Sequence, residues 1–320
     1  MIKPLMLAFC VVIAVGGMSS QASSWQPSPG LAQIPIWPGA APDAQPADGP
    51  EVSTTTGKDE LVAGKPYVWV ENVTQPTMTV YPAKGTNTGA AVIVFPGGGF
   101  IGLAMDLEGT EVCDWLTPKG ISCVVLKYRV PRSEDYYDKK LHRHVEPKVQ
   151  TAFQDAQRTI SLVRSRAGQW GIDPRKIGVM GFSAGGYLAA KTATEFKQRA
   201  YKPLDAADQQ SCRPDFSVPI YPGHLWRPRG ESSELRLNPS IHVTSEVPPT
   251  LLLMAENDHV DHVEQVLTYY QALKKAAVPV EMHLYAEGGH AFGLRPTKFP
   301  ITRWPQLAEA WLRTIGMISE

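Results

Sequence analysis

Two kinds of hydrophobic pattern alternate along most of this chain. Short continuous apolar runs are typical of strands buried on both faces of a sheet, and apolar residues spaced every three or four positions are typical of amphipathic helices. The runs predict strands at 67–70, 78–81, 91–95, 122–126, 176–180, 216–220, 251–255 and 281–285. The longer period predicts helices at 110–116, 149–166, 184–196, 262–275 and 304–315.

Strands that alternate with helices favour an α/β fold with one mostly parallel central sheet of about eight strands and helices on both faces. The first two strands, 67–70 and 78–81, are joined by a short connection and are expected to pair as an antiparallel edge. Residues 58–320 are expected to form one catalytic domain. Residues 23–57 are rich in Pro, Gly, Ala and Thr without an apolar period, and we expect an extended arm laid over that domain.

The first 22 residues have the features of a secretory signal peptide. Lys3 is followed by an apolar run at 5–15 and then by small and polar residues. Such a run is short for a membrane span. The expected mature protein is therefore secreted or periplasmic and has no membrane span. An uncleaved anchor is the alternative interpretation.

Composition limits the class of protein. Of 320 residues, 43% are hydrophobic, which is enough to build a core and excludes whole-chain disorder. Lys plus Arg and Asp plus Glu are both 31, so the formal net charge is zero and no nucleic-acid partner is expected. Beyond the predicted signal peptide the cysteines are Cys113, Cys123 and Cys212. Cys113 and Cys123 are interpreted either as a disulfide or as two buried thiols.

The most informative motif is Gly-Phe-Ser-Ala-Gly at 181–185, which lies between a predicted strand and a predicted helix. This context is typical of a nucleophile elbow, a strained turn that exposes the hydroxyl of Ser183. The amide of Ala184 then lies at a helix N-terminus, where it can donate to an oxyanion.

A serine nucleophile needs a base and an acid that orients the base. Asp258 follows the predicted strand 251–255, and His290 follows the predicted strand 281–285. Sites in open α/β sheets form at these carboxyl ends, so Ser183, Asp258 and His290 are the predicted catalytic residues. Glu256 and Asp261 are alternative acids, and the short distance along the chain from the strand favours Asp258.

A glycine-rich loop at 97–99 ends the predicted strand 91–95. Successive glycines let backbone amides converge on one point, and we predict that Gly98 and Gly99 complete the oxyanion hole. A phosphate-binding loop is disfavoured because no Gly-Lys-Ser/Thr follows.

Residues 258–262 carry two aspartates and two histidines, and a metal site is an alternative interpretation of this segment. No third ligand lies in a recognisable place, so no metal and no cofactor are expected.

These motifs resemble the α/β-hydrolase superfamily. The strongest matches are Gly-Phe-Ser-Ala-Gly-Gly at 181–186, Pro-Gly-Gly-Gly-Phe at 96–100 and Gly-Gly-His-Ala-Phe-Gly at 288–293, within a resemblance that spans roughly residues 34–315. The chain looks most like exported bacterial esterases grouped with acetylxylan and feruloyl esterases and with hormone-sensitive-lipase-like carboxylesterases. The latter usually have His where this chain has Pro96. The resemblance also implies that Asp258 and His290 match the acid and base of the family.

The expected protein is therefore a serine carboxylesterase that deacetylates plant carbohydrate such as acetylxylan. Its expected binding partner is this ester substrate. Alternatives are a general short-chain carboxylesterase, a peptidase of the prolyl-oligopeptidase type, and a binding protein that has lost catalysis. Two segments, 222–249 and 132–147, are expected to cover the site. The oligomeric state is not predicted.

Overall fold

The computed structural model describes residues 24–46, 49–130, 137–138, 143–144, 149–227 and 234–318. The predicted signal peptide, residues 1–22, lies outside these ranges, as does most of the predicted covering segment 132–147. No helix within the described ranges is both long and apolar enough to cross a membrane.

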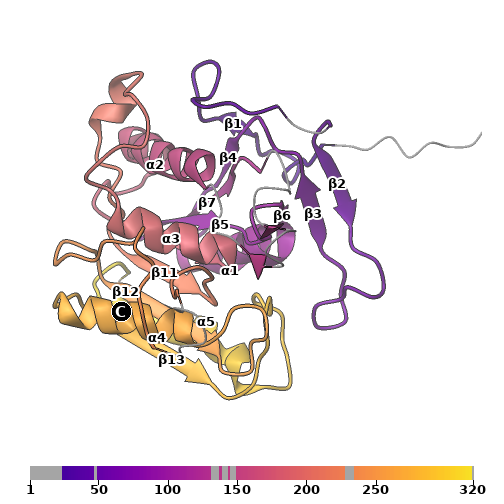
Figure 1. Cartoon of the computed structure of the whole chain (residues 1–320). Helices are drawn as coiled ribbons and strands as arrows, with labels where there is room; N and C mark the ends of the chain where they lie inside the picture. The colour runs from indigo at the N-terminus through magenta and orange to yellow at the C-terminus, as the bar shows by residue number, and fades with distance from the viewer. Residues whose placement is uncertain are drawn as a thin grey trace, which may run out of the picture.

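An eight-stranded sheet forms the centre of the molecule, and the predicted fold class is confirmed (Figure 1). Six neighbouring strands are parallel, β4 runs antiparallel to them, and the edge strand β1 pairs antiparallel with β4. In spatial order the strands are β1 (Ile34–Pro35), β4 (Thr77–Tyr81), β7 (Ser122–Lys127), β5 (Ala91–Phe95), β10 (Ile177–Phe182), β11 (Ser217–Ile220), β12 (Thr250–Ala255) and β13 (Val280–Tyr285).

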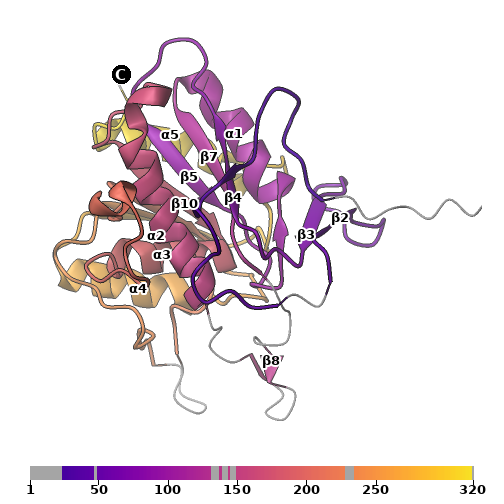
Figure 2. The same cartoon turned by 90° about the horizontal axis from the view of Figure 1, so that it is seen from above.

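Helices cover both faces of this sheet (Figure 2). On one face lie α1 (Glu111–Leu116) and α5 (Trp304–Thr314); on the other lie α2 (Gln150–Ser165), α3 (Ala184–Thr194) and α4 (Glu264–Lys275). Every residue of β5 and β10 is buried, as expected for strands covered on both sides. Short 3₁₀ helices occur at Thr117–Lys119, Ala167–Trp170, Ala206–Gln209 and Pro300–Arg303, and a π-helical turn at Asp106–Thr110 precedes α1.

The predicted pairing of strands 67–70 and 78–81 is wrong. The first of them, β3 (Val68–Glu71), lies in a separate three-stranded sheet between β2 (Val52–Thr55) and β6 (Gly102–Ala104). The chain turns at Asn72, whose φ is +57°, and Val73 then pairs with Val130 beyond the end of β7. This turn directs β4 to β7 and leaves β3 free to pair with β6.

A hydrogen bond holds the N-terminal segment against the main domain, and a disulfide links two elements within that domain. In the N-terminal segment, buried Trp37 donates its Nε1–H to Asp155 Oδ1 of α2 at 2.8 Å. Cys113 of α1 and Cys123 of β7 form a disulfide, which resolves the alternative left open by the sequence, and Cys212 is a buried free thiol. A two-stranded pair, β8 (Tyr137–Asp138) and β9 (Arg143–His144), is also present.

Candidate active site

Ser183 lies in the sharp turn between β10 and α3, with φ at +52° in the left-handed region. Two glycines permit this turn. A Cβ on Gly181 would lie 1.9 Å from the carbonyl oxygen of Gly185, and a Cβ on Gly185 would lie 2.0 Å from that of Phe95. A side chain at either position would therefore force the strand and helix apart, and the backbone strain stored at Ser183 is typical of functional sites.

A continuous chain of hydrogen bonds joins Ser183, His290 and Asp258. His290 Nε2 lies 2.9 Å from Ser183 Oγ, and its Nδ1 lies 2.6 Å from Asp258 Oδ2. Because a carboxylate can only accept, Nδ1 carries the proton and Nε2 accepts the serine hydroxyl. The structure thus brings the three residues predicted from sequence into an arrangement suited to nucleophilic catalysis.

Asp258 is buried and fixed by its own loop. Its other oxygen, Oδ1, accepts the amides of Val260 at 2.9 Å and Asp261 at 3.0 Å. With both oxygens engaged, the carboxylate has a single orientation toward His290. The alternative acid Glu256 is exposed and makes no contact with the histidine, within the part of the chain that the structure describes.

The loop that carries His290 is held by Asn257. The Oδ1 atom of Asn257 accepts the amides of Gly288 at 3.0 Å and Gly289 at 2.8 Å. The acid loop after β12 and the histidine loop after β13 are therefore joined directly. This contact helps to fix the position of the loop from which the His290 imidazole extends toward Ser183.

The pKa of His290 is raised above its ordinary value. Burial by itself lowers this pKa, but the hydrogen bond that Nδ1 donates to Asp258 and the charges of Asp258 and Asp261 outweigh burial and raise it. A raised pKa makes the imidazole a better acceptor of the serine proton.

Asp261, the other alternative acid, also lies beside the histidine. Its Oδ2 is 3.9 Å from Nε2, the nitrogen that faces Ser183, and not near Nδ1. Burial raises the pKa of Asp261 to about 6. The position of Asp261 therefore fits a group that modulates the site electrostatically and not the acid that orients the imidazole.

The glycine-rich loop supplies backbone amides to the same pocket. Gly98 has φ at +132° and Gly99 at +61°, and a Cβ on Gly98 would lie 2.2 Å from the carbonyl oxygen of Gly102. The amides of Gly98, Gly99 and Ala184 make no hydrogen bond to another described residue. All three residues line the pocket that contains Ser183. They therefore share a pocket with Ser183, as the predicted oxyanion hole requires.

Sequence reasoning missed the buried carboxyl group that holds this loop. Glu108 Oε2 accepts the Gly97 amide at 2.8 Å, and Oε1 accepts the hydroxyl of Tyr221 at 2.8 Å. Only 2% of Glu108 is exposed, and this burial raises its pKa. The Tyr221 ring also contacts the His290 ring at a centroid distance of 5.0 Å. The available signal was a pair of acidic side chains, Asp106 and Glu108, at the end of a largely apolar segment after the glycine loop.

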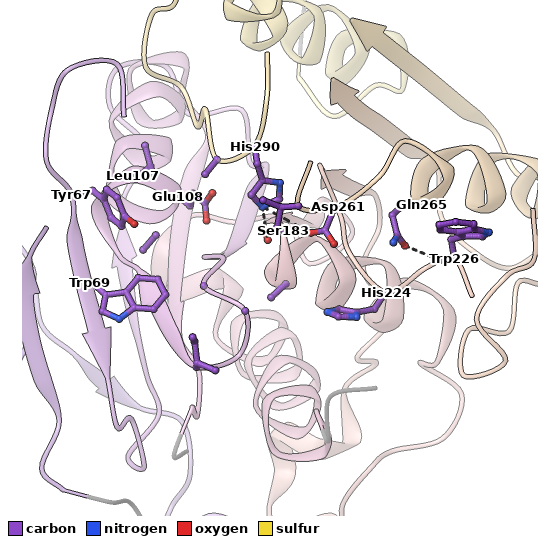
Figure 3. Close-up of a pocket in the computed structure, with 17 residues that line it drawn as sticks. Tyr67, Trp69, Leu107, Glu108, Ser183, His224, Trp226, Asp261, Gln265 and His290 are labelled. Carbon is purple, nitrogen blue, oxygen red and sulfur yellow. Dashed lines mark hydrogen bonds and ion pairs between the residues drawn. The ribbon is translucent and has the colours of Figure 1, made fainter. Parts of the chain in front are cut away.

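A pocket of about 490 Å³ opens over Ser183 and His290 (Figure 3). One wall carries Trp69 of β3 and Tyr67 just before that strand, and the opposite wall carries His224, Trp226 and Gln265. Gln265 Oε1 accepts the amides of Leu225 and Trp226 at 2.7 Å each, which fixes the second wall. The predicted covering segment 222–249 thus contributes to the pocket, although residues 228–233 lie outside the described ranges.

Comparison with known proteins gives this geometry a context. The chain is 29% identical over 229 residues to an acetylxylan esterase from Xylanibacter ruminicola, a match that covers 64% of this chain and 42% of that protein. It is 24% identical to Esterase LipC from Mycobacterium tuberculosis, covering 64% of this chain and 54% of the relative. The chain thus spans about half the length of these curated relatives.

Solved structures are similar over a larger share of the chain. An acetyl ester-xyloside bifunctional hydrolase from Caldicellulosiruptor lactoaceticus has a TM-score of 0.67 and 31% identity, covering 90% of this chain and 97% of the other. A butyrate-bound esterase from Thermogutta terrifontis has a TM-score of 0.61 at 21% identity, covering 77% and 91% of the two chains, and supports the fold alone.

Residues 112–314 match the model of the prolyl oligopeptidase family. This match covers more than half of the chain and contains the elbow, the acid loop and the histidine loop. The chain therefore belongs to the prolyl oligopeptidase family, within the α/β hydrolases.

Proposed function

We propose that this protein is a serine carboxylesterase that works through an acyl-enzyme. The observation that carries this proposal is the hydrogen-bonded chain from Ser183 through His290 to buried Asp258, beside a pocket that Gly98, Gly99 and Ala184 also line. These parts supply a nucleophile, a base, an orienting acid and a site for an oxyanion.

The reaction has two halves. Ser183 Oγ attacks the ester carbonyl while His290 Nε2 takes its proton, and the carbonyl oxygen becomes an oxyanion held by the amides of Gly98, Gly99 and Ala184. Each such donor is typically worth about 3 kcal/mol in the transition state. His290 then protonates the departing alcohol, which leaves the acyl group on Ser183.

Water completes the cycle. His290 accepts a proton from the water, the hydroxide attacks the acyl carbon, and the same amides hold the second oxyanion. The acid departs and the proton returns to Ser183. Throughout, Asp258 stabilises the charged imidazolium and keeps Nδ1 protonated.

The proposed substrate is an acetyl ester on plant carbohydrate, with acetylxylan as the favoured case. Its support is the similarity to a protein named acetylxylan esterase and to a solved acetyl ester-xyloside hydrolase. The pocket agrees with this choice, since it combines aromatic side chains with several polar groups close to Ser183.

The test is acetate release from acetylated xylan by the purified protein, with p-nitrophenyl acetate and butyrate as simple esters. Ser183→Ala is the inactive variant, and Ser165→Ala, at an exposed serine of α2, is the matched control. Acetate release that Ser183→Ala loses and Ser165→Ala keeps is the expected result. Hydrolysis of the nitrophenyl esters alone would support a general short-chain carboxylesterase.

A peptidase is the second candidate, because the family model is that of the prolyl oligopeptidases. The same triad can attack an amide, with His290 protonating the leaving amine. Proline-containing p-nitroanilides run beside the esters distinguish the two functions. Faster turnover of the anilides would replace the esterase proposal.

We also propose that the protein is exported, with residues 1–22 removed as a signal peptide and residues 23–57 serving as an arm on the domain 58–320. The charged residue, apolar run and small residues at the N-terminus support this. Sequencing the N-terminus of protein recovered outside the cytoplasm tests it. Retention of residues 1–22 would contradict cleavage.

A further inference from the structure

A second cavity of about 500 Å³ adjoins the catalytic pocket and shares two of its residues, Tyr67 and Trp69. It lies along the hairpin of β2 and β3, the pair of strands that Figure 1 shows beside the main domain. We call it the hairpin groove. Its lining residues are Thr54, Thr55, Thr56, Gly57, Glu60, Tyr67, Trp69 and Glu71.

Strand alternation explains how the hairpin forms this groove. Side chains alternate between the two faces of a strand, so those of Tyr67, Trp69 and Glu71 point to the same face. Thr54 of β2 pairs directly with Trp69. The opposite face carries Val70, which is fully buried against the domain. The hairpin therefore presents aromatic, hydroxyl and carboxylate groups on the face that the groove occupies.

Trp69 is fixed where the two cavities meet. Its Nε1–H donates to Glu71 Oε1 at 2.9 Å. Its indole lies so close to the glycine loop that a Cβ on Gly102 would come within 2.4 Å of the ring, and one on Gly98 within 2.9 Å. The ring is thus a preorganised surface that reaches from the oxyanion loop to the groove (Figure 3).

The lining chemistry selects an uncharged ligand rich in hydroxyl groups. The carboxylates of Glu60 and Glu71 can accept hydrogen bonds from hydroxyl groups, and threonine hydroxyls can both donate and accept hydrogen bonds. Indole and phenol rings offer apolar faces to the C–H side of a sugar ring. The two carboxylates also disfavour an anionic ligand.

We propose that the hairpin groove binds sugar units of a carbohydrate backbone next to the unit whose ester lies at Ser183. The proposal rests on the proposed function, since it assumes that the ester is carried by carbohydrate. A chain long enough to pass Trp69 would contact both cavities. Affinity should therefore rise with the number of sugar units.

Binding of unacetylated xylo-oligosaccharides tests the groove without any hydrolysis. Calorimetry with xylobiose and xylohexaose should give an affinity at least tenfold higher for the hexamer. Gly57→Leu is the diagnostic variant, because Gly57 is exposed, lines the groove and has open space where a side chain would begin. Gly39→Leu, at an exposed glycine with equally open space and outside both cavities, is the matched control.

We expect Gly57→Leu to abolish the advantage of the hexamer and Gly39→Leu to keep it. Thr54→Val, which removes one hydroxyl at nearly constant volume, should reduce that advantage in part. Equal affinities for xylobiose and xylohexaose in the wild-type protein would overturn the proposed sugar-binding role of the groove. A higher affinity for the hexamer that Gly57→Leu leaves intact would overturn it as well.

Kinetics separate this proposal from the esterase proposal. With acetylated oligosaccharides, the ratio of kcat/KM for hexamer to dimer should exceed ten in the wild-type protein and approach one in Gly57→Leu. Absence of ester hydrolysis on every substrate would contradict the proposed function, while the binding experiment would still test the groove. Hydrolysis with the same kcat/KM at every chain length would contradict the groove alone.

Discussion

Asp261 places a carboxyl oxygen 3.9 Å from His290 Nε2, the ring nitrogen that faces Ser183, the proposed nucleophile. Asp258 meanwhile hydrogen bonds the opposite nitrogen, Nδ1. The imidazole therefore lies between two carboxyl groups with different tasks. In the proposed mechanism, Asp258 orients the ring, and Asp261 changes the electrostatic potential at the nitrogen that takes up the proton.

Asp261→Asn should move the acid limb of the pH–rate profile to lower pH. The charge of Asp261 is one of the causes that raise the pKa of His290, so removing it lowers that pKa and leaves more neutral imidazole in acid. The profile of kcat/KM on p-nitrophenyl acetate measures the shift. A limb that stays in place or moves to higher pH would show that Asp261 does not act on the histidine.

The same variant should be more stable than the wild-type protein at alkaline pH. Burial raises the pKa of Asp261 from 3.8 to about 6, so ionisation of this group costs the folded state stability as pH rises through that window. Asparagine removes the penalty, and we expect a gain on the order of 2–3 kcal/mol at pH 8 that disappears near pH 4. Urea unfolding at both pH values measures it. An equal difference in unfolding free energy between variant and wild type at pH 8 and at pH 4 would show that ionisation of buried Asp261 does not cost stability.

Glu108→Ala should lower kcat by about tenfold to a hundredfold, because misplacing oxyanion donors costs transition-state stabilisation. Glu108 fixes the Gly97 amide next to the proposed donors, and its loss also leaves the Tyr221 hydroxyl without this acceptor. KM for a small ester should change little. Steady-state kinetics and circular dichroism, with Glu264→Ala on α4 as control, separate a positioning defect from unfolding. A folded variant with unchanged kcat would show that Glu108 does not position the oxyanion donors.

Replacing Cys113 and Cys123 together by serine should destabilise the protein by about 2 kcal/mol, since the disulfide closes only a short loop. Buried Cys212 gives a matched Cys212→Ser control. The comparison is made by urea unfolding with and without reductant. A double variant as stable as the wild-type protein, or a wild-type protein insensitive to reductant, would contradict a stabilising role.

Much of the fold could be predicted because the buried parallel strands read as continuous apolar runs. Strand β5 was predicted at its observed bounds, and β12 and β13 within one residue, so the loops after them were also placed. Asp258 and His290 could be predicted because each lies in the loop that directly follows one of these strands. The glycines at 181–185 predict the tight turn in which Ser183, the proposed nucleophile, lies.

Features that depend on pairing between distant segments could not be read from the pattern. Whether β3 joins the main sheet is decided by the turn at Asn72 and by β6, and neither has a periodic signal. The contact of Glu108 with Tyr221 joins residues 113 positions apart. Trp69 gains its place in the pocket only when the hairpin folds against the glycine loop.

The central claim is that Ser183 is the nucleophile, and covalent labelling tests it most directly. A fluorophosphonate should add once to the native protein, and peptide mapping by mass spectrometry should place the adduct on Ser183. Ser183→Ala should neither be labelled nor hydrolyse esters, while Ser165→Ala should do both. A folded wild-type protein that resists labelling, or a Ser183→Ala variant that keeps wild-type hydrolysis, would contradict the account.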